Sequence, residues 1–320
     1  MKYSLLAILL CQLVQPMAWA ADTMRAIVVS DGKLQEENVP IPVPQAGQVR
    51  IHVRAAAVNP VDWKLAERAA PGSHAIPGRD LAGVIDAVGP DAGAWHTGQS
   101  VMAIATGGAY AEYAIAAVRA VALKPAHMSF EEAAGLPVVG ETAWRAIVTV
   151  GNVQAGQRVL VEGGAGGVGS SAVQIAKARG AQVIATASPS HDALLHALGA
   201  DEIIDYHSAH FEDSLKNLDV VVNTVDADTG IRSIGAIRPG GVLVSVVGAP
   251  PAAQCAAAGI RCAVTGPVTG DFLGALTELA DHAQLRVNID QRLPLADAAQ
   301  AWELNRSGHT GGKIILEVSR

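Results

Sequence analysis

The sequence has few aromatic residues, few charges and few cysteines, and each shortage narrows the classes of protein it can encode. Aromatic residues make up 4% of the 320 residues, which disfavours a base-stacking surface for nucleic acid. Charged residues make up 17%, the net charge is −7, and no stretch concentrates Lys and Arg. We therefore expect no nucleic-acid partner. Half of the residues are hydrophobic, which indicates a compact globular fold.

The three cysteines do not follow the spacing of a metal site. Cys255 and Cys262 have no Cys or His neighbour at the separations that structural zinc requires. We expect these two to be small apolar core residues, and a disulfide in an oxidising compartment is the alternative. No metal ligands are predicted.

The chain lacks an apolar run long enough to span a bilayer, but its N-terminus has the pattern of a cleaved signal. Lys2 supplies a positive charge, residues 4–14 are mostly apolar, and the small-x-small pattern at residues 18–20 precedes Ala21. We expect residues 1–20 to be a signal peptide and the protein to be periplasmic or secreted, without a membrane span. The alternative is a start at Met24 and a cytoplasmic protein.

In the rest of the chain, strand patterns give way to alternating strand and helix patterns, and a strand pattern returns at the C-terminus. Residues 24 to about 112 contain short apolar runs separated by Pro and Gly, which predict a β-rich, barrel-like unit. From about residue 129 to 281, strand patterns alternate with helix patterns, which predicts βαβ units and a parallel sheet. The apolar segment 311–316 predicts a final strand that rejoins the first unit.

The segment 162–171, EGGAGGVGSS, is rich in glycine and indicates the kind of ligand that the protein binds. Its Gly164, Gly166 and Gly169 fit the pattern G-x-G-x-x-G, with an apolar strand at 159–161 before it and an amphipathic helix at 168–179 after it. Such a turn lets backbone amides at a helix N-terminus approach a pyrophosphate. The sequence therefore predicts a dinucleotide site.

The choice of dinucleotide depends on the end of the second strand. NAD-binding proteins carry an acidic residue there for the ribose 2′-hydroxyl. This chain has Ser188 and Ser190 instead, with no carboxylate before Asp192. We expect NADPH, with NADH the less favoured choice, although no Arg or Lys lies nearby.

Several motifs together resemble the zinc-free quinone oxidoreductase branch of the medium-chain dehydrogenases/reductases. They are AVNPVDWK at 57–64, PGRDLAG at 77–83, GAYAEY at 108–113, LPVVGETAW at 136–144, the glycine turn, LGAD at 198–201 and GKI at 312–314. The resemblance implies an α/β protein with a GroES-like β-barrel domain at 24–140, completed by 284–320, and a doubly wound Rossmann domain at 141–283. A homodimer is usual among similar proteins.

The resemblance also implies roles for single residues. The pyrophosphate would be held by Gly164, Gly166, Gly167, Val168 and Gly169, and the 2′-phosphate would be contacted by Ser188 and Tyr206. The nicotinamide and its ribose would lie near Asn59 and Thr142, and the carboxamide would be bound by Val247 and Gly248. The cofactor would also be reached by Lys313. The catalytic candidates are Lys64, near the substrate oxygen, and Tyr110, in the substrate cleft. A solvated Lys64 and a packed Tyr110 are the alternatives. Arg79 and Asp80 are expected to form a structural ion pair.

The zinc branch of the superfamily has a cysteine in the loop at 59–64 and Gly-His-Glu at 78–80, and this chain has neither the Cys nor the His. The resemblance therefore implies a zinc-independent reductase that transfers hydride from NADPH to a small-molecule quinone or α,β-unsaturated carbonyl. The alternative is a non-catalytic NADP(H)-binding redox sensor or structural protein, which export from the cytosol would favour.

Overall fold

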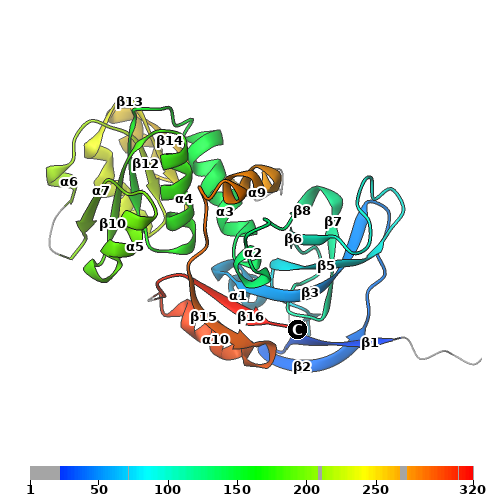
Figure 1. Cartoon of the computed structure of the whole chain (residues 1–320). Coiled ribbons are helices and arrows are strands. Elements are labelled where there is room, and N and C mark those ends of the chain that lie inside the picture. Colours follow the sequence, from blue (N-terminus) through cyan, green and yellow to red (C-terminus); the bar gives the residue numbers. More distant parts are fainter. Residues whose placement is uncertain (1–21, 71, 208–210, 267–271, 309, 320) are drawn as a thin grey trace, which may run out of the picture.

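The computed structural model describes residues 22–70, 72–207, 211–266, 272–308 and 310–319, which form two lobes (Figure 1). Both ends of the chain contribute to one lobe, and the middle of the chain makes the other. The predicted signal peptide at 1–20 lies outside the described residues. No helix in the described part of the chain has the length and apolar character needed to cross a bilayer.

The first lobe contains a seven-stranded and a three-stranded sheet. The strand orders are β15-β16-β3-β5-β6-β8, with β7 on β3, and β2-β1-β4. The strands are β1 (Thr23–Ser30), β2 (Lys33–Pro40), β3 (Gln48–Val58), β4 (His74–Ala75), β5 (Asp80–Val88), β6 (Ser100–Ile104), β7 (Tyr113–Ala117), β8 (Val121–Leu123), β15 (Ile289–Pro294) and β16 (Lys313–Glu317). The helices are α1 (Pro60–Glu67), α2 (Phe130–Ala134) and α10 (Ala298–Arg306). As predicted, the last strand rejoins this unit, because β16 pairs antiparallel with β3.

The second lobe contains a six-stranded parallel sheet in the order β11-β10-β9-β12-β13-β14. Its strands are β9 (Arg158–Glu162), β10 (Gln182–Ala187), β11 (Glu202–Asp205), β12 (Leu218–Asn223), β13 (Ile237–Ser245) and β14 (Arg261–Val264). The helices are α3 (Pro137–Trp144), α4 (Gly167–Ala178), α5 (Asp192–Ala197), α6 (Phe211–Ser214), α7 (Ala227–Ser233), α8 (Ala252–Ala257) and α9 (Leu273–Asp281), and a π-helical turn at Arg145–Val150 follows α3. The strand order reverses between β9 and β12, and ligands of such sheets bind at the carboxyl ends of the strands beside that point.

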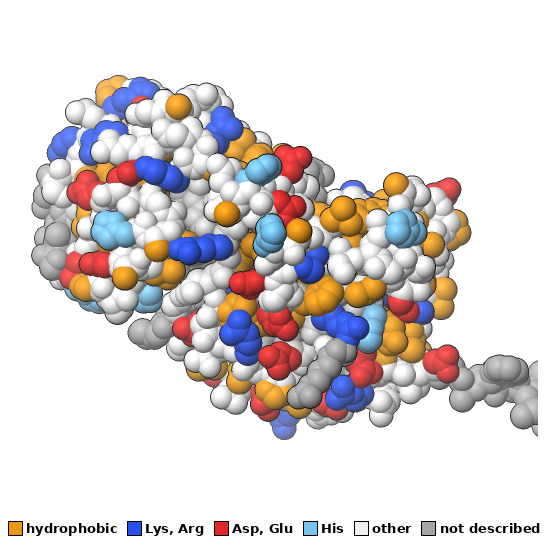
Figure 2. All heavy atoms as spheres, in the orientation of Figure 1, with side chains coloured by type: hydrophobic (Ala, Val, Ile, Leu, Met, Phe, Trp, Pro, Cys, Tyr) orange, Lys and Arg blue, Asp and Glu red, His pale blue; other side chains and the backbone are white. Residues whose placement is uncertain are grey.

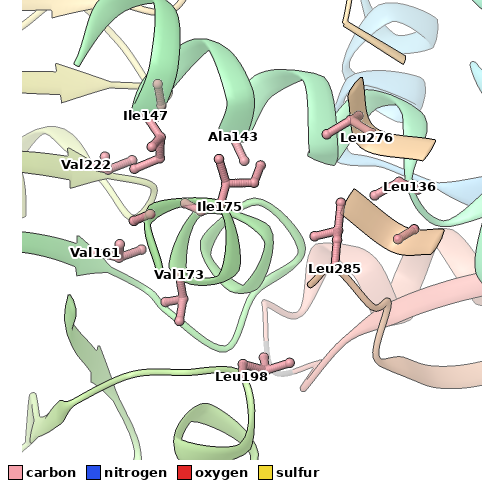
Figure 3. Packing of buried hydrophobic residues seen from close by; sticks show 14 of the residues in the cluster. Leu136, Ala143, Ile147, Val161, Val173, Ile175, Leu198, Val222, Leu276 and Leu285 are labelled. Carbon is pink, nitrogen blue, oxygen red and sulfur yellow. The ribbon is translucent and has the colours of Figure 1, made fainter. Parts of the chain in front are cut away.

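One hydrophobic core runs through both lobes. It includes Ala57 of β3 and Ala82 of β5 in the first lobe, and Val159 of β9 in the second. Figure 3 shows Val173 and Ile175 of α4 among side chains from the sheet and from α3. Complete burial of one such side chain contributes about 1.5–3 kcal/mol. The shared core therefore fixes the start of α4 relative to β3 and its neighbours.

The two cysteines were expected to be separate apolar core residues, and this prediction was wrong, because the alternative, a disulfide, is present. Cys255 of α8 and Cys262 of β14 form a disulfide with a Cα–Cα distance of 6.0 Å. The sequence placed both residues in apolar surroundings, and Cys255 is indeed buried. What it could not show is that the chain reverses between α8 and β14 and so brings the two sulfurs together.

The disulfide is expected to contribute about 2 kcal/mol to the free energy of unfolding, because it closes a short loop in the unfolded chain. Urea denaturation of the Cys255→Ala/Cys262→Ala variant should show a loss of that size. Wild-type protein under a reducing agent should lose the same amount, while the variant should not respond to the reductant. Equal stability of the wild type with and without reductant would contradict the prediction.

Candidate active site

The glycine turn joins β9 to α4 at the point where the strand order reverses. Gly163 has a φ of +72°, which residues with a side chain rarely adopt. A Cβ at Gly169 would lie 2.1 Å from the carbonyl oxygen of Gly163, and one at Gly164 would lie 2.9 Å from the Cβ of Ala185. The turn therefore needs glycine at these positions for its own shape. The pattern search found Gly164 and Gly169 but missed the role of Gly163.

The N-terminus of α4 has room for an anion. Helix α4 begins after Gly166, and no side chain caps it. A Cβ at Gly166 would meet no described atom closer than 3.5 Å. Backbone N–H groups at such an end attract phosphate groups. The start of α4 therefore has the space and the backbone N–H groups that a phosphate needs, and the assignment of residues 164, 166, 167, 168 and 169 to a pyrophosphate remains a prediction.

The end of β10 presents a small hydroxyl and imidazole cluster. The Ser188 hydroxyl lies 2.9 Å from Nδ1 of His191 and 3.0 Å from the Ser190 hydroxyl. Tyr206, which follows β11, is 53% exposed. Ser188 and Tyr206 were predicted from the resemblance, whereas His191 was not predicted. The described hydroxyl and imidazole groups of this cluster include no carboxylate that would repel a phosphate.

Lys313, Asn59 and Asp80 form a buried cluster between the glycine turn and the first lobe. The Lys313 ammonium donates to Oδ1 of Asn59 at 2.6 Å and lies 3.7 Å from Oδ2 of Asp80. The Asn59 amide donates to the same Asp80 oxygen at 2.9 Å, and the Val138 N–H donates to the other at 2.9 Å. A Cβ at Gly167 would lie 3.2 Å from Cδ of Lys313. The cluster therefore touches the turn that fits the pyrophosphate.

Burial acts on both charges of this cluster. It raises the pKa of Asp80 and lowers the pKa of Lys313, while their mutual attraction opposes both shifts. The expected ion pair between Arg79 and Asp80 is not formed, because Asp80 is paired with Lys313 and Asn59. Arg79 precedes β5 and is partly exposed, whereas Asp80 is the first residue of β5 and is fully buried.

Tyr110 is fully buried and belongs to a second buried cluster. Its hydroxyl donates to Oδ2 of Asp62 at 2.9 Å and accepts from Nε1 of Trp302 at 3.3 Å. The same Asp62 oxygen accepts the N–H of Asn59 at 2.9 Å, which caps helix α1. Burial is the largest cause that raises the pKa of Asp62 to about 7 and the pKa of Tyr110 well above its ordinary value. Asp62 was not among the predicted site residues.

The other predicted residues lie around these clusters. The Thr142 hydroxyl donates to the carbonyl of Val138 within α3 at 2.6 Å, and Val247 is 45% exposed just after β13, followed by Gly248. Lys64 is exposed on α1, with its ammonium 5.2 Å from the centre of the Trp63 ring.

A cavity of about 310 Å³ opens beside α1. Its lining is mostly apolar or backbone, and it also includes Asp62 and Arg79. Lys64 and Tyr110 are not in its wall. Within the described residues, no three His, Cys, Asp or Glu side chains are grouped so that they could hold a metal ion. Figure 2 shows basic and acidic side chains interspersed on both lobes, and hydrophobic side chains where the lobes meet.

Two family models match the chain. The model described as "Alcohol dehydrogenase GroES-like domain" covers residues 45–126, and the one described as "Zinc-binding dehydrogenase" covers residues 198–316. A 2-methylene-furan-3-one reductase of Solanum lycopersicum is 35% identical over 300 residues, which span 88% of this chain and 74% of that protein. The chain belongs to the medium-chain dehydrogenases/reductases, in the quinone oxidoreductase branch.

Two further relatives agree with this assignment. The NADPH-dependent alkenal/one oxidoreductase of Arabidopsis thaliana, described as chloroplastic, is 34% identical over 88% of this chain and 75% of its own length. The structure of the quinone oxidoreductase from Coxiella burnetii superposes with a TM-score of 0.84 and 32% identity, covering 93% of this chain and all of the other. The protein is an oxidoreductase, and the predicted GroES-like and Rossmann-like architecture is confirmed.

Glu162, the last residue of β9, should make the stability of this region depend on pH. Its Oε1 accepts the Ser233 hydroxyl, and burial is the largest cause that raises its pKa to about 7. A raised folded-state pKa means that this stabilisation is present at low pH and is lost as the pH rises through 7. Between pH 5 and pH 8 the wild type should lose about 2 kcal/mol more unfolding free energy than Glu162→Gln.

Urea denaturation at both pH values measures this difference. The exposed Glu202→Gln variant is the control and should follow the wild type. Parallel losses in the wild type and Glu162→Gln would contradict the prediction.

Proposed function

We propose that the protein is an NADPH-dependent reductase that transfers hydride to a quinone or to the β-carbon of an α,β-unsaturated carbonyl without a metal ion. The observation that carries the proposal is the glycine turn at the reversal of strand order, with the Asn59–Asp80–Lys313 cluster against it. The names of the relatives support the acceptor class, since they describe an enone-type reductase, an alkenal/one oxidoreductase and a quinone oxidoreductase.

NADPH, when bound, supplies the hydride. The backbone of residues 164–169 and the N-terminus of α4 would bind its pyrophosphate, and Asn59, Thr142, Val247, Gly248 and Lys313 would hold the nicotinamide half. Ser188, Tyr206 and His191 would take the 2′-phosphate through hydroxyl and imidazole groups. Holding the reactants together would supply much of the rate. The name of the Arabidopsis relative supports NADPH over NADH.

The chemistry of the side chains supports zinc independence. Where the zinc branch has a Cys and a His, this chain has the segment 59–64, which starts at Asn59 and contains no Cys, and Arg79. Asn59 is engaged by Lys313 and Asp80, and a guanidinium does not ligate zinc. An electron-poor acceptor needs no metal to become reducible, whereas alcohol oxidation uses one to acidify the hydroxyl.

The test follows NADPH absorbance with 1,4-benzoquinone, 9,10-phenanthrenequinone and a short enone, using protein from Met24 onward treated with a chelator. We expect turnover with at least one acceptor and weaker binding of NADH than of NADPH. NADPH binding without turnover would instead support the redox-sensor alternative. Light scattering of the same sample tests the proposed homodimer.

Lys64→Ala is expected to lower kcat less than about threefold. The ammonium lies over the Trp63 ring and outside the cavity wall, and exposed charged side chains are usually solvated. Steady-state kinetics with the best acceptor measure the effect. A loss above tenfold, with unchanged melting temperature, would restore Lys64 as a catalytic residue.

We also propose that residues 1–20 are a cleaved targeting segment. The charge, apolar run and small-x-small pattern support this, and the Cys255–Cys262 disulfide favours an oxidising destination. Several relatives are described as chloroplastic, among them those of Arabidopsis thaliana, Triphysaria versicolor and Spinacia oleracea, which supports a targeting segment but not the same destination. Mass spectrometry of the native N-terminus should find Ala21 first. A chain that begins at Met24 would overturn the proposal.

A further inference from the structure

The two carboxyl oxygens of Asp62 differ in their hydrogen bonds. Oδ2 accepts two hydrogen bonds, from the Asn59 N–H and the Tyr110 hydroxyl, each at 2.9 Å. Oδ1 is buried and has no hydrogen-bond partner among the described residues. Only 3% of Asp62 is exposed. A buried polar atom without a partner is costly, so its retention calls for an explanation.

The side chain of Asp62 lies in the wall of the 310 Å³ cavity. The rest of that wall is largely apolar, with Leu65, Ile76 and Ala105, or glycine backbone. Arg79 also lines it. A ligand that fits this wall has an apolar body and a small number of oxygen atoms. Quinones and enones belong to this class.

We propose that Asp62, in its carboxylic acid form, donates the proton on Oδ1 to an oxygen of an apolar ligand in this cavity. The inference rests on the proposed function for its catalytic part, in which Asp62 supplies the proton that accompanies hydride transfer. Since Oδ2 already accepts two donors and Oδ1 has no partner among the described residues, the proton belongs on Oδ1.

The step balances with one proton and one hydride. Bound NADPH would supply the hydride with its two electrons and would be oxidised to NADP⁺, and the carbonyl oxygen of the acceptor would become negative. The O–H bond of Asp62 breaks, its electron pair stays on the carboxylate, and a new O–H bond forms on the product as a hydroquinone or enol. The enol gives the ketone in water. Asp62 then takes a proton from solvent through the cavity.

The groups that surround Asp62 keep its pKa near neutral pH, where a carboxylic acid can act as a proton donor. Burial and the Asp80 carboxylate raise its pKa, while Asn59, Tyr110 and Lys313 lower it, with a result of about 7. An acid in this range is protonated near neutral pH and is still able to give up its proton. After donation, the two bonds to Oδ2 stabilise the carboxylate.

The first experiment measures binding without turnover. Cyclohexanone, which has a carbonyl oxygen but no conjugated double bond, is titrated into the apoprotein by calorimetry at pH 6 and pH 9. The wild type should bind it about tenfold more weakly at pH 9, because a carboxylate repels the carbonyl oxygen. Asp62→Asn should bind equally at both pH values, since its amide does not titrate. Wild-type binding that is independent of pH would overturn the ligand site.

The second experiment measures the proton itself. Infrared difference spectra of the wild-type apoprotein should contain a protonated-carboxyl band that titrates near neutral pH and is missing in Asp62→Asn. Glu162→Gln serves as a matched control that removes a different buried carboxyl whose pKa is also about 7. If Asp62→Asn does not fold, the pH dependence of cyclohexanone binding by the wild type decides the question alone.

Kinetics test the catalytic part. With the best acceptor, kcat of the wild type should fall above pH 7, and Asp62→Asn should have a kcat at least 100-fold lower with a flat profile and an unchanged Kd for NADPH. Asp86→Asn, which alters an ion pair with Arg50 elsewhere on the barrel lobe, should behave as the wild type. A folded Asp62→Asn enzyme with normal kcat would overturn the role of Asp62. Absence of turnover in the wild type, with pH-dependent cyclohexanone binding intact, would instead count against the proposed function.

Discussion

Gly166→Ala is expected to fold normally and to bind NADPH about a hundredfold more weakly. A Cβ at Gly166 would meet no described atom closer than 3.5 Å, so the apoprotein has room for it. The same methyl group would occupy the space that a pyrophosphate needs to approach the backbone at the start of α4. A hundredfold loss corresponds to about 2.7 kcal/mol of binding free energy.

Gly169→Ala provides the contrast, because at Gly169 a side chain would collide with the protein backbone, whereas at Gly166 it would occupy only space that the cofactor needs. Its Cβ would lie 2.1 Å from a backbone oxygen, which cannot move aside like the end of a flexible side chain. The apoprotein itself should then lose about 1–3 kcal/mol, the usual cost of an added group in a tightly packed site. Gly274→Ala in α9, where a Cβ would have open space, should change neither stability nor binding.

Calorimetric binding of NADPH and urea denaturation of the three variants measure these effects separately. If Gly166→Ala binds NADPH like the wild type, the pyrophosphate does not approach this turn, and the cofactor placement fails. If Gly169→Ala is as stable as the wild type, the turn has more freedom than the close approach to Gly163 implies.

The architecture could be predicted from the sequence because its signals are local. The strand pattern at 159–161, the turn and the helix pattern at 168–179 follow one another directly, and the structure has β9, the turn and α4 there. The return of the last strand to the first lobe was also predictable, since strand patterns lie at both ends of the chain. Strands and helices are recognised from the spacing of apolar residues, and tight turns from glycine, and both can be read directly from a sequence.

The clusters could not be predicted because they depend on contacts between distant residues. In the sequence Asp62 is only one residue of the 57–64 motif, and only the fold brings the Tyr110 hydroxyl, with Trp302 behind it, onto its carboxyl group. The same holds for His191, whose ring reaches Ser188 only because a helical turn follows β10. Arg79 and Asp80 were paired in the prediction because they are neighbours, yet Asp80 is fully buried in β5 and Arg79, which precedes β5, is partly exposed.

Lys313→Met is expected to destabilise the protein by about 3–5 kcal/mol at pH 8. The ammonium is the buried cation beside Asp80, which has no exposed surface, and removal of one partner leaves the other charge buried without compensation. The loss should be smaller at pH 5, because the raised pKa of Asp80 lets the carboxyl take up a proton more readily there. Urea denaturation at both pH values measures the effect.

The double variant Lys313→Met/Asp80→Asn separates the lost charge from lost packing. An asparagine at 80 can still accept the Val138 N–H, and its amide can donate to Oδ1 of Asn59 once Lys313 no longer occupies that oxygen and the Asn59 amide turns over. The double variant has no buried charge left in the cluster, so most of the stability should return and its pH dependence should disappear. A double variant as unstable as Lys313→Met would mean that the Lys313 side chain stabilises the junction by packing against Gly135 and Gly167, and that the ion pair contributes little.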